Sequence, residues 1–315
     1  MATIETVSGP VDEEQLGLTL AHEHIRSTSE GARATFPHLY DEQGEFDRAV
    51  EGFKAVMDQG VKTIVEPTCM DLGRDVGLAQ RVVDATGIQL VMCTGIYGSR
   101  YTFLPQCFAN RDADYIADVF VHDIEEGMQG SDVKAAFLKC AVDEPGITED
   151  VDKVLRACAR ASKRTGRPIM SHSHPASRTG LKQMDVFDEE GVDPAKVVIA
   201  HTGDTDDLEY IEDLLGRGCY IGMDRYGLDI ILPVDKRNAT VVELCQRGHA
   251  EKMMLSQDYV GTLDWFPPEM IAAEVPKWSF TLVLDEVVPA IKEAGVTQEQ
   301  VDAMMIGAPR RWLAS

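Results

Sequence analysis

Two histidines that are two residues apart, His22 and His24, are the first residues in the chain whose types and spacing suit chemistry. They lie in an apolar run, residues 17–25, that is typical of a buried β-strand, in which side chains two positions apart face the same way. Neutral imidazole is the commonest protein ligand for a metal ion. An isolated His-x-His pair is more often a surface or core feature, so the metal interpretation depends on ligands from elsewhere.

Later apolar runs supply such ligands in or at the ends of predicted strands: Lys139, His172, His201 and Asp258. Each residue has an ordinary explanation when taken singly. A lysine in a strand usually extends to solvent, and an aspartate at a strand end usually caps a helix. In a barrel of parallel strands, however, the carboxyl ends of all strands gather at one rim. Their shared location therefore predicts a metal site.

The chain alternates between apolar, β-branched runs and segments of helical periodicity, which indicates an α/β fold with a parallel sheet. The segments 45–59, 148–158 and 205–218 carry apolar residues at helical spacing. Eight alternations predict a closed (β/α)8 TIM barrel, and an open doubly wound sheet is the alternative, because periodicity does not reveal closure. The predicted strands are residues 17–25, 61–68, 89–97, 135–142, 168–174, 196–201, 219–225 and 252–258.

The 315 residues contain no Pro-, Ser- or Gly-rich linker, so we expect one domain over residues 1–315 with a short N-terminal extension, residues 1–16. The formal net charge of −23 disfavours nucleic acid and membrane surfaces as partners. The first residues lack the pattern of a secretion signal, and no run approaches a membrane span. Seven scattered cysteines without a Cys-x-x-Cys motif fit reduced thiols, and the predicted location is the cytoplasm.

Four imidazoles, one carboxylate and a bridging group are the ingredients of a two-metal site for hydrolysis of an ester-like bond. Lys139 could provide the bridge only as a neutral amine carboxylated by carbon dioxide, because an ammonium cannot bind a cation. Its apolar neighbourhood and the nearby cations favour that form. An ion pair with Asp143 is the alternative. Asp258 could accept a proton from the attacking water and pass it to the leaving oxygen.

Taken together, these motifs resemble the phosphotriesterase-like lactonases of the amidohydrolase superfamily over essentially the whole chain. The matching motifs are His22-Glu-His24, Thr94-Gly-Ile-Tyr97, Phe137-Leu-Lys139-Cys, Ser171-His172-Ser-His174, His201-Thr-Gly-Asp-Thr-Asp-Asp207, Gly222-Met-Asp-Arg225-Tyr-Gly227, Leu255-Ser-Gln-Asp258 and Pro309-Arg-Arg311.

The resemblance implies a two-metal lactonase. One metal would be bound by His22, His24 and Asp258, and the other by His172 and His201. Carboxylated Lys139 and a hydroxide would bridge the two ions, which could be zinc, cobalt, iron or manganese. The implied substrates are N-acyl-homoserine lactones and related γ- or δ-lactones, opened by attack of the bridging hydroxide, with promiscuous hydrolysis of organophosphate triesters. The resemblance also implies a homodimer.

Further residues receive roles from the same resemblance. Tyr97 and Arg225 match positions near the bridging hydroxide and the lactone ring. The loop over residues 259–281 corresponds to the acyl-chain pocket, and its large side chains are apolar enough to bind an alkyl tail. These side chains are Trp265, Phe266, Met270, Ile271 and Trp278. The chain departs from the resemblance at Gln257, Gly307 and Ala308, which leaves the acyl-length preference open.

Other polar residues receive lesser roles. We expect His174 to lie at the loop mouth or behind the ligands, and Glu23 to face away from the metals. We expect Asp204 to Asp207 to cap the helix after the sixth strand, and an additional role of Asp206 and Asp207 in orienting ligands stays open. Two alternatives to a lactonase stay open at this stage. One is a phosphotriesterase (aryldialkylphosphatase) as the main activity, and the other is a non-catalytic barrel that binds metal.

Overall fold

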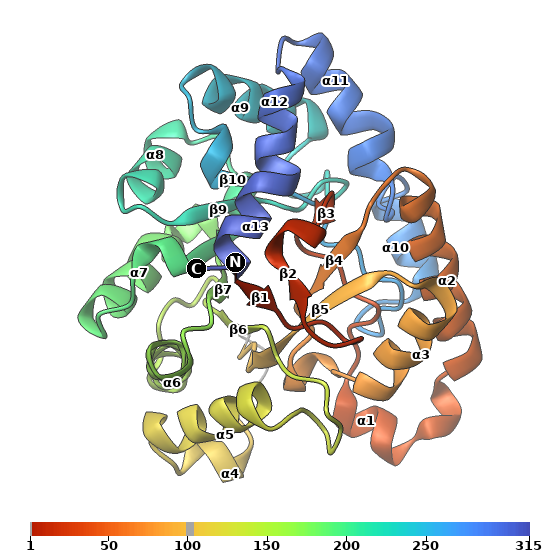
Figure 1. The fold of residues 1–315 in the computed structure, drawn as a ribbon, viewed down its shortest axis with the longest axis vertical. Coiled ribbons are helices and arrows are strands. Elements are labelled where there is room, and N and C mark those ends of the chain that lie inside the picture. Colours follow the sequence, from red (N-terminus) through yellow and green to blue (C-terminus); the bar gives the residue numbers. More distant parts are fainter. Residues whose placement is uncertain (1, 99–103) are drawn as a thin grey trace.

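The computed structural model describes residues 2–98 and 104–315, and its centre is a barrel of eight parallel strands (Figure 1). Each strand is hydrogen-bonded to the next in chain order. Every residue of these eight strands except Gln89 is buried, because both faces of the barrel sheet are covered. The strands are β3 (Thr19–Leu20), β4 (Thr63–Glu66), β5 (Gln89–Gly95), β6 (Phe137–Ala141), β7 (Ile169–His172), β8 (Val197–Ala200), β9 (Tyr220–Met223) and β10 (Met253–Leu255).

The barrel closes between the segments that follow β3 and β10. The backbone amide of His24 donates to the carbonyl of Tyr259 at 2.8 Å, and the amide of Asp258 donates to the carbonyl of His22 at 3.0 Å. A parallel bridge also pairs His24 with Val260. The prediction of a single (β/α)8 TIM barrel is confirmed, and the open doubly wound sheet is excluded because the strand order never reverses.

The first predicted strand is too long. β3 ends at Leu20, so His22 and His24 lie in the loop that follows and not in a strand. The alternation of strand side chains therefore does not explain why the two rings are close, with centroids 5.3 Å apart. Their backbone bonds to the segment after β10 position them instead.

An outer layer of helices covers the barrel (Figure 1). The predicted helices appear at the expected places, and Thr148 caps α6 by accepting from the amide of Val151 at 3.3 Å. Gly166 ends this helix with a positive φ of 79°. The longer helices are α2 (Glu42–Asp58), α3 (Val76–Thr86), α5 (Ala113–Glu125), α6 (Glu149–Thr165), α7 (Thr179–Glu189), α8 (Leu208–Gly216) and α9 (Val234–Gln246). The shorter ones are α1 (Glu30–Thr35), α4 (Gln106–Ala109), α10 (Pro268–Glu274), α11 (Val288–Glu293), α12 (Gln298–Asp302) and α13 (Ala308–Leu313).

The two ends of the chain cover the amino-terminal end of the barrel. A small hairpin of β1 (Thr3–Ile4) and β2 (Val11–Asp12) lies beside α13, and the two termini lie next to each other in front of the strands (Figure 1). Trp312 packs edge-to-face on Phe137 with ring centroids 5.3 Å apart, and its indole Nε1 donates to the carbonyl of Lys196 at 3.1 Å. The opposite end of the barrel stays open.

Among the residues that the structure describes, no helix combines the length and the apolar character that a membrane span requires.

Replacing Trp312 with alanine should lower the free energy of unfolding by about 3–5 kcal/mol, because a fully buried aromatic ring and its hydrogen bond are lost. Urea denaturation measures this change. Trp265→Ala is the matched control, since Trp265 is 47% exposed, and it should cost about 1 kcal/mol or less. Equal losses in the two variants would contradict the role given to Trp312.

Candidate metal centre

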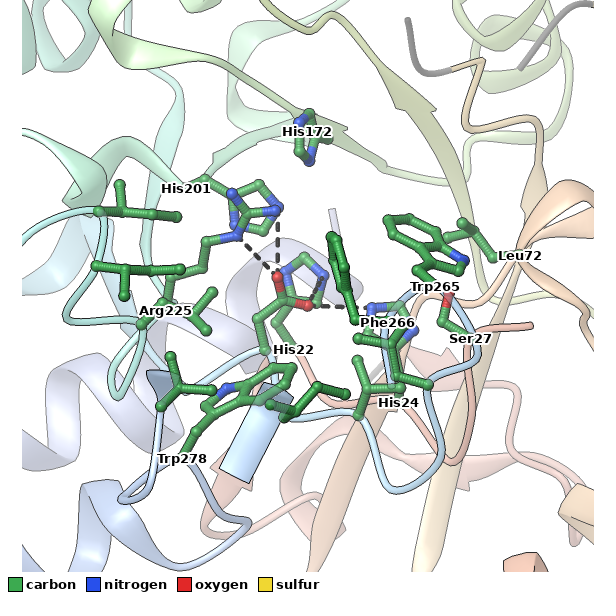
Figure 2. Close-up of a pocket in the computed structure, with 18 of the residues that line it drawn as sticks. His22, His24, Ser27, Leu72, His172, His201, Arg225, Trp265, Phe266 and Trp278 are labelled. Atoms are coloured by element: carbon green, nitrogen blue, oxygen red, sulfur yellow. Dashed lines mark hydrogen bonds and ion pairs between the residues drawn. The ribbon is translucent and has the colours of Figure 1, made fainter. Parts of the chain in front are cut away.

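All six predicted metal ligands line one cavity at the carboxyl end of the barrel, where the loops after the strands meet. All six are buried. Figure 2 shows the rings of His22, His24 and His201 turned toward one another at the floor of this cavity, with His172 on the side away from Trp278. The six residues are His22, His24, Lys139, His172, His201 and Asp258.

The carboxylate of Asp258 lies at the centre of the group. Its Oδ1 is 3.3 Å from Nε2 of His22 and 3.2 Å from Nε2 of His24, and its Oδ2 is 3.9 Å from Nε2 of His201. Nζ of Lys139 is 3.3 Å from Nε2 of His22. Ligand atoms of His22, His24 and Asp258 lie within 4.8 Å of one another, a spacing at which one cation can contact all three.

The protonation states also fit bound cations. Burial, with a smaller effect of Lys139, lowers the pKa of His22 to about 3, and burial lowers the pKa of His172 well below its usual value. Burial likewise lowers the pKa of the Lys139 amine. For Asp258, burial would raise the pKa, but His22 and His201 hold it well below the usual range. The site thus offers the neutral imidazoles of His22 and His172 beside an ionised carboxylate, donors suited to zinc-like ions.

Asp224, which follows β9, lies within hydrogen-bonding distance of two of the imidazoles. No role was predicted for this residue from the sequence. Its Oδ2 is 2.9 Å from Nδ1 of His22, and its Oδ1 is 3.0 Å from Nδ1 of His201. Burial would raise the pKa of Asp224, but the two histidines lower it well below its usual range. Because an ionised carboxylate only accepts, both Nδ1 atoms carry the proton and both Nε2 atoms are free to bind metal. The feature of the sequence that could have identified Asp224 is its place directly before Arg225, at the end of a predicted strand.

Glu23 faces away from the cavity and fixes the segment that carries Asp258. Its Oε1 accepts from Ser256 Oγ at 2.6 Å and from Gln257 Nε2 at 2.8 Å, and its Oε2 accepts from the amide of Tyr259 at 2.9 Å. Asp258 itself has a positive φ of 50°, a conformation that favours glycine. The clamp by Glu23 holds this backbone in place.

Arg225 and Tyr97 both line the cavity, as the sequence analysis expects. Arg225 donates from Nε to Oδ2 of Asp258 at 2.9 Å and from Nη1 to Oδ2 of Asp204 at 3.1 Å. The hydroxyl of Tyr97 is 3.2 Å from Nδ1 of His172. The expectation for Asp204 is wrong, because its carboxylate pairs with Arg225, whereas Asp207 caps α8 through the amide of Tyr210.

The cavity has a volume of about 300 Å³ and a largely apolar wall. The five residues predicted to form the acyl-chain pocket line it, and Figure 2 shows Trp265 and Trp278 on opposite sides of the space. A second part of the wall comes from the loop after β9, which the sequence analysis does not identify. The predicted residues are Trp265, Phe266, Met270, Ile271 and Trp278, and the additional ones include Leu228, Ile230 and Ile231.

Two minor expectations have clear outcomes. Nδ1 of His174 lies 2.9 Å from Ser177 Oγ, and His174 is not among the residues that line the cavity, so it has no place at the mouth. Within residues 2–98 and 104–315, Lys139 forms no ion pair with Asp143. The alternative explanation for the buried lysine therefore lacks a contact to support it.

Comparisons with known proteins agree with this arrangement. A sequence model of the phosphotriesterase family matches residues 2–313. An aryldialkylphosphatase of Saccharolobus solfataricus is 48% identical over 306 residues, which cover 96% of this chain and 97% of that protein. A phosphotriesterase homology protein of Mycobacterium tuberculosis is 41% identical over 322 residues, covering 99% and 97%. The solved structure of the phosphotriesterase from Mycobacterium tuberculosis superimposes with a TM-score of 0.95 at 40% identity, covering 99% of this chain and 98% of that one.

Replacing Asp224 with asparagine should lower zinc affinity by about 10–100-fold. The amide nitrogen of asparagine would face Nδ1 of one histidine, forcing that ring to carry its proton on Nε2. Competition with a chromophoric chelator measures the affinity. Asp185→Asn is the control, since Asp185 pairs with Arg217 at the surface. Unchanged zinc affinity in Asp224→Asn would show that the carboxylate does not orient the ligands.

Proposed function

The chain belongs to the phosphotriesterase family, and from that premise we propose that its main reaction is the opening of lactone rings, with slower hydrolysis of organophosphate triesters. Family membership makes the protein an ester hydrolase, and the substrate class is the proposal. The observation that carries it is the long apolar wall beside the polar floor, formed by the loops after β9 and β10. An alkyl tail attached to a lactone matches such a wall.

Phosphotriester hydrolysis as the main activity is the rival, and one relative bears the name aryldialkylphosphatase. A triester with short substituents would require a small and compact pocket around the phosphorus. Here the wall extends from Tyr97 through Trp265 to Met270 and Ile271 on α10, farther than short substituents need. This length favours a substrate with a tail. The third possibility, a barrel that binds metal without turnover, has no support from the relatives, which bear the names of hydrolases.

We propose that the cavity floor holds two divalent cations, of zinc, cobalt, iron or manganese. His22, His24 and Asp258 would hold one of them, and His172 and His201 the other, with carboxylated Lys139 between them. When bound, two such ions supply a water that ionises near neutral pH and polarise the ester oxygen. Phosphotriesterase-family enzymes use two metal ions, and the low pKa values of His22 and His172 and the lowered pKa of Lys139 suit that chemistry.

The remaining side chains would hold and move the proton. Asp258 is ionised at neutral pH, so its carboxylate can accept the proton of the attacking water and pass it to the leaving oxygen. Arg225 fixes Oδ2 of Asp258 and leaves Oδ1 facing His22 and His24. The hydroxyl of Tyr97 borders the space above His172, where it would contact the lactone ring. The apolar wall would exclude bulk water from this floor.

Two further expectations stay predictions, the first implied by the family resemblance and the second by the cysteine pattern and the N-terminal residues. One is a homodimer, which sedimentation velocity can test. The other is a cytoplasmic location, which fractionation of the source cells can test.

A series of lactones with graded alkyl chains, assayed beside a paraoxon-like triester, tests the proposed substrate class. We expect kcat/KM to rise about fourfold for each added methylene until the wall is covered, since each buried methylene contributes about 0.8 kcal/mol. Trp265→Ala should flatten this dependence while the reaction of the shortest lactone changes little. A kcat/KM for the triester above that for every lactone would reverse the proposed order of activities.

The bridging role of Lys139 has its own test. Lys139→Ala should bind fewer than two zinc ions per chain and lose most of its activity, since kcat falls when the water is no longer shared between two ions. Bicarbonate with a short carboxylic acid should restore part of the activity, because the acid can occupy the vacated space. Lys236→Ala, a change at a surface ion pair, is the control. An alanine variant with two zinc ions and the wild-type rate would refute the bridge.

A further inference from the structure

The imidazoles at the floor of the cavity are supported in different ways. Asp224 holds His22 and His201 directly through its ionised carboxylate. His24 instead faces a hydroxyl, since its Nδ1 is 2.7 Å from Oγ1 of Thr68. Thr68 is 2% exposed and is not among the residues that line the cavity, so it acts on the site only through His24.

The neighbours of the Thr68 hydroxyl determine the direction of each hydrogen bond. Besides His24, Oγ1 of Thr68 contacts the carbonyl of Arg26 at 3.1 Å and Oε1 of Glu66. The carbonyl of Arg26 only accepts. Burial raises the pKa of Glu66, but the backbone amides of Ile25 and Thr68, each donating to one of its oxygens, favour the ionised carboxylate, which also only accepts. The single hydroxyl proton of Thr68 therefore points to one of these two acceptors. The hydroxyl oxygen must then accept from Nδ1 of His24. This leaves Nε2 of His24 without a proton, on the side that lies 3.2 Å from Oδ1 of Asp258.

Glu66 holds this arrangement from behind. It is the last residue of β4, is 2% exposed, and receives only donors from its described neighbours. Its Oε1 accepts from the amide of Ile25 at 3.2 Å, and its Oε2 accepts from the amide of Thr68 at 3.2 Å. One carboxylate thus fixes the backbone on both sides of the contact, next to His24 and at Thr68.

We propose that Thr68 and Glu66 are positioning residues for one of the two metal ions, the ion that His24 shares with His22 and Asp258. The hydroxyl of Thr68, with its proton committed to an acceptor, sets the tautomer and the orientation of the His24 ring. The inference rests on the proposed function in that it presupposes two bound ions. It adds that Asp224 supports a ligand of each ion, through His22 and His201, whereas Thr68 contacts only His24 among the candidate ligands that the structure describes.

The test is zinc binding to three variants of the full-length protein, measured by equilibrium dialysis against zinc buffers, which resolves two binding steps. Thr68→Val keeps the shape of the side chain and removes the hydroxyl, and it should weaken one step by about 10–100-fold and leave the other unchanged. Thr68→Ser keeps the hydroxyl and should restore wild-type binding.

Thr63→Val is the matched control. It also removes a buried threonine hydroxyl, one that lies at the start of β4 and donates a hydrogen bond to the carbonyl of Leu16 at 2.6 Å. It should lower the thermal midpoint without affecting either zinc step. If Thr68→Val does not fold, Glu66→Gln provides the same measurement, with a smaller loss of about 3–10-fold at the same step, because a neutral amide supports Thr68 less strongly than a carboxylate.

Two zinc steps in Thr68→Val within about threefold of the wild type would overturn the inference. So would a loss of equal size in Thr63→Val, which would indicate a general effect of buried hydroxyls, or a loss in Thr68→Ser equal to that in Thr68→Val. A wild-type protein that binds fewer than two zinc ions after reconstitution would instead overturn the two-metal part of the proposed function. The failures of the two proposals are therefore distinguishable.

Discussion

The burial of one ionised carboxylate, that of Asp258, is the interaction on which the rest of the site depends. Removing a carboxylate from water costs several kcal/mol unless charged or hydrogen-bonding partners replace the lost solvent. Arg225 supplies one full charge at 2.9 Å, and the surrounding imidazoles offer nitrogens at 3.2–3.9 Å. Apart from Arg225, the groups nearest to this carboxylate are imidazoles, so the cavity floor favours added positive charge. A divalent cation could supply that charge, since ligand atoms of His22, His24 and Asp258 lie within 4.8 Å of one another.

The same contacts close the barrel and position the site. The amide of Asp258 donates to the carbonyl of His22, so the bond that joins the last barrel segment to the first also sets the distance between two candidate ligands. Both Asp258 and His201 have positive φ values, 50° and 65°, in a region that costs a non-glycine residue roughly 1–2 kcal/mol. Glu23 and Asp224 offset this strain through bonds to the adjacent backbone. Loosening the closure would therefore change the site before it changed the remaining strands.

The sequence predicts the barrel and the candidate ligands well for one reason. Parallel strands of alternating α/β units must place their carboxyl ends together, so residues such as His201 and Asp258 can be assigned to one rim from their position in apolar runs alone. Thr68 could not be found this way, and the place of Asp224 at a strand end does not reveal which side chains it contacts. Their partners lie 44 and 202 residues away in the chain, and periodicity carries no information about which side chains meet across a rim. The end of β3 was missed because an apolar loop and an apolar strand have the same composition.

Gln257 shows how the variable wall is attached to the fixed floor. This residue departs from the family resemblance, yet it is fully buried beside Asp258. Its side chain donates to Glu23 at 2.8 Å and to the carbonyl of Phe280 at 2.7 Å, and its own carbonyl accepts from the indole of Trp278 at 2.7 Å. One residue thus joins the clamp behind Asp258 to the loop that forms the apolar wall. None of these contacts includes a candidate ligand, but the bond to Glu23 belongs to the clamp that fixes the backbone on both sides of Asp258. A change at Gln257 would therefore act both on the apolar wall, through Trp278 and Phe280, and on the position of Asp258, through Glu23.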